Sequence, residues 1–99
     1  MADTHILDLM RSFVLTGDLK AALFLSQCMQ TAKQSEAGAF TRTYQEWQEE
    51  LGLNKAEINR CRKQAARWVT TELENLQGEE TLRCVVDLRQ IASDLEDIR

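Results

Sequence analysis

Proline is absent from this 99-residue chain, and glycine (four residues) and aromatic residues (6%) are scarce. A β-sandwich or barrel needs many tight turns, which proline and glycine commonly supply. Their scarcity argues against such folds and favours helices. The 43% hydrophobic and 28% charged residues are ordinary for a globular protein. The length predicts a single domain over residues 1–99.

Long apolar runs are also missing, because the longest, Ala21–Leu25, is far too short to cross a bilayer. The N-terminus lacks the basic start and apolar segment of a secretory signal. Three widely spaced cysteines, Cys28, Cys61 and Cys84, fall on apolar stripes and predict free thiols in a reducing compartment. We therefore expect a cytoplasmic protein without a membrane partner.

Enzyme signatures are absent as well. No glycine-rich phosphate loop is present, and the carboxylates fall on exposed helix faces or in a loop. The cysteines lack the C-x-x-C spacing of a metal site. The sequence predicts no catalytic residue, no metal and no cofactor.

Helical periodicity of apolar residues is the main pattern in this sequence. Apolar residues recur at helical spacing from Asp3 to Leu15 and again from Leu19 to Gln34. In the second of these predicted helices they occupy most of the helix circumference. An all-round apolar helix is expected in the middle of a fold. Ser35 to Gly38 then predicts a turn.

A helix-turn-helix pattern follows. Thr43 with Glu46 matches a capping box that opens a short helix to Leu51, and Asn54 with Glu57 opens another to about Val69. Gly52 between them suits a left-handed turn position. Apolar residues lie where the two helices are expected to touch: Trp47, Leu51, Leu53, Ile58, Cys61 and Ala65.

Charge is distributed unevenly over this chain of net charge −4. Residues 54–70 hold five basic side chains and one acidic, whereas residues 71–99 hold eight acidic and three basic. A local basic field decides where a polyanion docks. At about 100° per residue, Asn59, Arg60, Lys63 and Arg67 fall opposite the apolar stripe.

Two strands are predicted after Trp68, one over Val69–Thr71 and one over Thr81–Val86, with a polar loop from Asn75 to Glu80. Asp87 caps a last helix with an apolar stripe of Leu88, Ile91, Leu95 and Ile98. Two interpretations of this stripe stay open. It folds back onto the first helix, or it forms a homodimer with a second copy.

The runs GDLKAALFL (17–25), TYQEWQEELGL (43–53), INRCRK (58–63) and LRCVVDL (82–88) carry a resemblance. They resemble small winged helix-turn-helix proteins of phages, plasmids and bacterial mobile elements, including replication-initiation and DnaD-like DNA-binding domains. The resemblance implies a wing over Val69–Val86. The expected fold is mainly α, a winged helix-turn-helix with about five helices and one two-stranded β-hairpin wing.

These features predict a double-stranded DNA-binding protein, a transcriptional regulator or an accessory factor of replication or maintenance, with helix 54–69 in the major groove. The predicted DNA contacts are Arg42, Lys55, Asn59, Arg60, Lys63 and Arg67.

The alternative is a non-catalytic adaptor of the same fold with a protein partner. Its binding surface would be acidic, because the loop region carries Glu72, Glu74, Glu79 and Glu80 against Arg83 alone.

Overall fold

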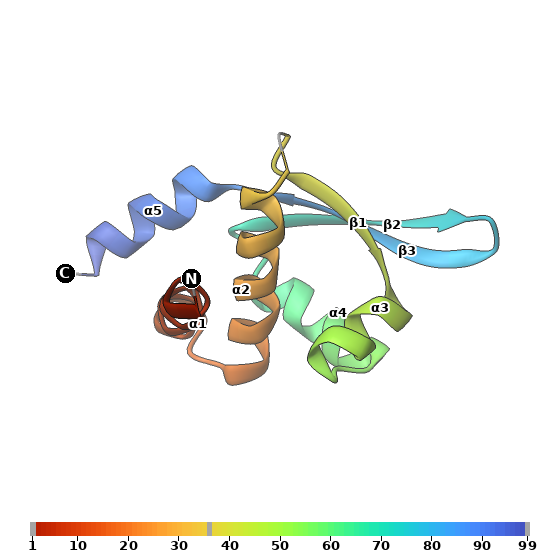
Figure 1. Ribbon diagram of the computed structural model, residues 1–99, viewed down its shortest axis with the longest axis horizontal. Helices are drawn as coiled ribbons and strands as arrows, with labels where there is room; N and C mark the ends of the chain where they lie inside the picture. Colours follow the sequence, from red (N-terminus) through yellow and green to blue (C-terminus); the bar gives the residue numbers. More distant parts are fainter. Residues whose placement is uncertain (1, 36, 99) are drawn as a thin grey trace.

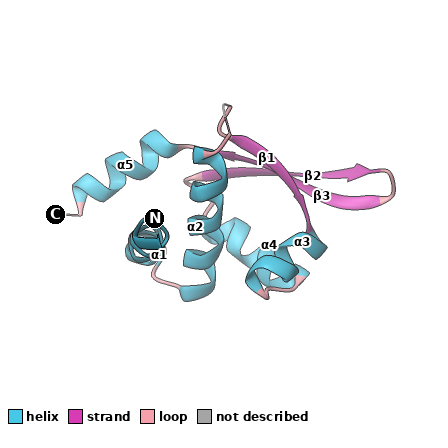
Figure 2. Ribbon diagram, in the orientation of Figure 1, coloured by secondary structure: helices cyan, strands magenta, loops and turns pink. Residues whose placement is uncertain are grey.

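The structure, a computed structural model, describes residues 2–35 and 37–98. Within those residues the chain forms five helices and three strands (Figures 1 and 2). The elements are α1 (Ala2–Thr16), α2 (Leu19–Lys33), β1 (Ala39–Thr43), α3 (Tyr44–Leu51), α4 (Lys55–Gln64), β2 (Val69–Leu76), β3 (Glu79–Val86) and α5 (Leu88–Asp97).

The sheet corrects the predicted fold class. A mainly α domain with one two-stranded hairpin wing was expected, but the antiparallel sheet has three strands in the order β1-β3-β2. β1 pairs with β3 from Ala39↔Val85 to Thr43↔Thr81. The fold is therefore mixed helix and sheet. The local sequence of residues 39–43 did not indicate a strand. These residues form one by pairing with residues some forty positions further along the chain, which a local pattern does not reveal.

The hairpin is also longer than predicted. β2 and β3 pair from Val69↔Val86 to Leu76↔Glu79, so most of the expected loop over residues 75–80 is strand. Gln77 and Gly78 form the turn, both with positive φ (54° and 85°). Two consecutive positive φ values match the twist of a tight hairpin.

Helix α4 is shorter than the predicted helix 54–69 and ends at Gln64. The Ala65 carbonyl accepts hydrogen bonds from the Trp68 and Val69 amides, both at 2.9 Å, which closes a turn. The β-branched residues Val69, Thr70 and Thr71 then begin β2, where pairing with β3 outweighs continuation of the helix.

Helix α2 is the central helix, as its all-round apolar pattern predicted. It packs between α1 on one side and α4 on the other, with the sheet across one end (Figure 1). The buried apolar core is shared by α2, α3, α4, the hairpin and α5, while α1 adds the partly buried Leu15. Its largest fully buried side chains are Trp47, Phe24, Leu25, Ile58, Leu82, Val69, Cys28, Cys61 and Cys84. No helix within the described residues is both long and apolar enough to cross a bilayer.

Candidate nucleic-acid interface

Two capping boxes fix α3 and α4 around a three-residue connection. The Glu46 amide donates to Thr43 Oγ1 at 3.0 Å, and Glu46 Oε1 accepts from the Thr43 amide at 2.9 Å. Asn54 and Glu57 repeat the arrangement at 2.9 and 3.0 Å. Gly52 ends α3 with φ +72°, a conformation that glycine adopts without strain. This local chemistry confirms both predicted helix starts.

The inner stripe of α4 is buried as predicted. Ile58, Cys61 and Ala65 are almost completely inaccessible to solvent. The outer stripe carries Arg60 and Lys63, which are exposed. Within the described chain, neither of these two cations forms an ion pair.

Glu57, the single acidic residue of α4, forms its ion pair with Lys20 of α2, although the charge of Arg60 also acts on it. The Asn54 amide and the Lys20 ammonium of α2 both donate to its carboxylate, and these bonds lower its pKa, the Asn54 bond most. Arg60 and Lys63 are consequently the exposed charges that α4 offers to an anion, with the half-buried Arg62 beside them.

Lys55 was predicted to lie in the DNA groove, but it is bound to the hairpin. Its Nζ donates to both carboxylate oxygens of Glu80 at 2.8 and 2.9 Å, and this bond raises the pKa of Lys55. The acidic end of the hairpin therefore lies against the first turn of α4 and neutralises Lys55.

Arg42 lies on β1, where it has partners in the surrounding elements. Its Nη1 donates to Glu50 of α3 at 3.0 Å, and its guanidinium lies 5.2 Å from the Phe40 ring centroid and 5.4 Å from that of Trp47. Only 18% of the side chain is exposed. The predicted phosphate contact is thus a largely covered cation that ties β1 to α3.

Arg67 is paired with Asp94 of α5. Its Nε and Nη2 donate to the two carboxylate oxygens at 2.6 and 3.1 Å, and the Trp68 indole donates to the same carboxylate at 2.7 Å. The Arg67 and Trp68 bonds together hold the pKa of Asp94 far below its usual range. Arg67 therefore joins α5 to the turn after α4.

Asn59 is half-buried on the side of α4 that faces β2. Its Oδ1 accepts from the Tyr44 hydroxyl at 2.6 Å and from Arg62 Nη1 at 3.0 Å. Arg62, on the same helix, also donates to Thr71 of β2 at 2.9 Å. A bidentate contact from Asn59 to adenine would require its oxygen to leave these donors.

A polar hollow separates α4 from β2. It has a volume of about 420 Å³ and is lined by Asn59, Arg62, Lys63, Ala66 and Thr71. Two of these five residues are basic and none is acidic. The sequence did not predict this hollow, because Thr71 comes to it from the next element of the fold.

The cysteines behave as small core residues. Cys28, Cys61 and Cys84 are buried and unpaired. Burial raises the pKa of the Cys28 thiol, and raises that of Cys61 to about 11. In the part of the chain that the structure describes, no three His, Cys, Asp or Glu side chains are placed to hold a metal ion.

Comparison of the chain with protein-family models, curated proteins and solved structures finds no match. The resemblance to replication-initiation and DnaD-like domains thus depends on the quoted runs of residues alone. It stays a prediction.

Proposed function

We propose that the chain binds double-stranded DNA through the exposed face of α4, with Arg60 and Lys63 as the principal contacts. The observation that carries this proposal is that both cations are exposed on the second helix of a two-helix unit and have no ion-pair partner among the described residues. An α-helix fits the major groove, and residues three apart lie on one side of it.

The neighbouring groups set how α4 approaches the duplex. Lys55 at the first turn is neutralised by Glu80, whereas Arg60, Lys63 and the polar hollow lie further along the helix. We therefore place the C-terminal half of α4 closest to the phosphates. Arg62 and the amide group of Asn59 border the same hollow and supply further donors.

The proposed role is that of a transcriptional regulator or an accessory factor of replication or maintenance. The resemblance of residues 17–25, 43–53, 58–63 and 82–88 to replication-initiation domains supports this choice. The proposed mechanism is non-covalent and uses the basic side chains of the chain itself.

The test is fluorescence anisotropy of a random-sequence duplex titrated with the protein at low and at higher salt. Two phosphate contacts predict that log K falls with log salt at a slope of about −1.8. The variant Arg60→Glu with Lys63→Glu is expected to abolish binding and to leave the circular dichroism spectrum unchanged, because both side chains are exposed.

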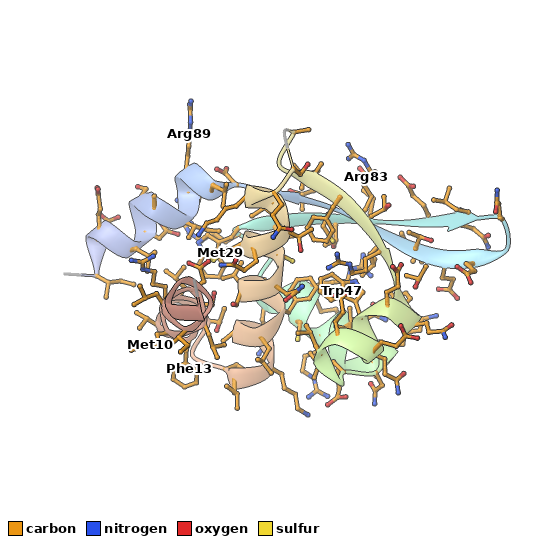
Figure 3. The ribbon with its side chains drawn as sticks, in the orientation of Figure 1. Met10, Phe13, Met29, Trp47, Arg83 and Arg89 are labelled. Atoms are coloured by element: carbon orange, nitrogen blue, oxygen red, sulfur yellow. The ribbon has the colours of Figure 1, made fainter. Side chains whose placement is uncertain are left out.

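The matched control is Arg83→Glu with Arg89→Glu. It makes the same change in net charge, but both arginines are exposed on the side of the sheet and α5 away from α4 (Figure 3). Retained binding by this control supports the assignment to α4, whereas equal loss in both variants contradicts it. Absence of wild-type binding at low salt would overturn the proposal in favour of the adaptor, whose partner would then be sought by pull-down.

A further inference from the structure

Helix α1 presents its polar side to the body of the protein. Asp8 and Ser12 are fully buried against α2. The Asp8 carboxylate accepts from Gln30 and, at 2.9 Å, from Lys33 Nζ, and the Ser12 hydroxyl lies 3.5 Å from the Met29 sulfur. These partners fix the rotation of α1. Both donors bind Oδ2, whereas Oδ1 has no hydrogen-bond partner among the described residues. Burying a carboxylate without any donor would cost more, so these bonds favour the observed rotation.

The opposite side of α1 is apolar and faces solvent. Ile6, Leu7, Met10, Phe13 and Val14 fall within an arc of about 120° on the helix. With Leu19 at the start of α2, each of these side chains is between 46% and 59% exposed. Figure 3 shows Met10 and Phe13 pointing away from α2 and α5. We call these six residues the α1 face.

A helix that turns its apolar stripe outward is the reverse of the usual arrangement in a monomer. The other large exposed apolar side chains, Leu73, Leu76, Val85 and Ile98, lie on the hairpin, the sheet and the end of α5. Scattered exposure of that kind is normal, whereas a contiguous apolar patch marks an interaction surface.

The area of the α1 face suits association of two chains. Its six side chains expose on the order of 600 Å², against about 800 Å² per partner in a standard interface. Leu9, which borders the face, adds to this area. Complete burial of this face on two copies would cover on the order of 1,200 Å², which is above the roughly 1,000 Å² expected of a specific interface.

The face is also complementary to itself. A two-fold interface sets one patch against its own copy, so a charged patch would repel itself and an uncharged one does not. The six residues carry no charge. Four of them, Met10, Phe13, Val14 and Leu19, line a hollow of about 340 Å³ together with Leu9, and we expect an apolar side chain of the second copy to fill it.

We infer that the α1 face is the interface through which two copies of this chain form a two-fold homodimer. This places the contact on α1 instead of on the C-terminal helix considered from the sequence. In α5 the Ile91 side chain is buried in the core, and Ile98 is the member of its stripe that stays exposed. The inference does not rest on DNA binding.

Sedimentation equilibrium over a range of micromolar concentrations tests it. The wild-type chain is expected to give twice the 11.4 kDa mass of one copy. Met10→Lys with Phe13→Lys should weaken the dimer at least about 100-fold, because each lysine would be desolvated against its copy. Both positions are solvent-exposed in the single chain, so the variant should keep the wild-type circular dichroism spectrum.

The matched control is Leu73→Lys with Leu76→Lys, which places the same charges at two equally exposed leucines of β2. A dimer that survives in this control and is lost in the α1 variant supports the inference. A monomeric wild type, a dimer that persists in the α1 variant, or equal loss in both variants overturns it. None of these outcomes involves DNA, so failure here and failure of the proposed function are distinguished.

Discussion

At the scale of single residues, Trp47 fills space in the core but buries an indole N–H without a hydrogen bond. Its side chain is fully buried, with the Phe24 ring centroid 5.0 Å away, and its indole N–H has no hydrogen-bond partner among the described residues. The indole supplies packing volume that holds α3 against α2, while its N–H loses solvation.

This predicts a difference between two substitutions at Trp47. Trp47→Ala should lower the free energy of unfolding by about 3–5 kcal/mol because it leaves a cavity. Trp47→Phe should cost less than about 2 kcal/mol, since an aromatic ring stays in place and the unpaired N–H is removed. Urea denaturation followed by circular dichroism measures both; equal losses would contradict this account.

Asp94 links the stability of the fold to pH. Its pKa is lowered by the hydrogen bonds from Arg67, Trp68 and Gln90. A carboxyl whose pKa is lower in the folded chain stabilises the fold above its unfolded pKa of about 3.9, and this contribution is lost as the pH falls towards the folded value.

Asp94→Asn is therefore expected to lower the Tm at neutral pH, and its difference from the wild type should narrow as the pH falls below the ordinary carboxyl range. Glu96→Gln is the control, because Glu96 is exposed on the same helix. Thermal melts at several pH values measure the effect. A gap between Asp94→Asn and wild type that stays constant with pH would refute the assigned role.

At the scale of elements, the starts of α3 and α4 are set by side chains within three residues of each cap. Asn54→Ala removes the acceptor for the Glu57 amide. It is expected to cost about 1 kcal/mol, whereas Asn54→Gly costs only a few tenths. A loss of 1 kcal/mol corresponds to a Tm lower by roughly 4–8 °C in a domain of this size. A melting temperature of Asn54→Ala equal to that of the wild type would show that the cap contributes nothing.

The ends of elements follow a different logic from their starts. The stop of α4 at Gln64 and the extension of β2 to Leu76 both depend on pairing with β3. Strand pairing is a non-local interaction, so the helical periodicity of residues 65–69 did not reveal where the helix ends.

At the scale of the whole molecule, the two proposed surfaces lie apart. α1 and α4 pack on opposite sides of α2 (Figure 1). A dimer formed through the α1 face would leave Arg60 and Lys63 of both copies accessible. The acidic hairpin reaches α4 through Glu80 and limits the basic surface to the second half of that helix.

The sequence by itself determined the features that depend on near neighbours. The capping boxes at Thr43 and Asn54, the turn at Gly52, the buried stripe of α4 and the burial of the three cysteines all follow from residues close along the chain. Capping and helical periodicity act over at most a few residues, so they can be recognised without knowing the fold.

Only the tertiary structure decided which charges are available and which apolar face is covered. Arg42, Lys55 and Arg67 meet carboxylates 8, 25 and 27 residues away, and β1 meets β3 across the whole α3–α4 unit. The periodicity of α1 marks an apolar stripe but not its direction, which the bonds of Asp8 to Gln30 and Lys33 set. Such contacts join segments that only the folded chain brings together, so no local pattern specifies them.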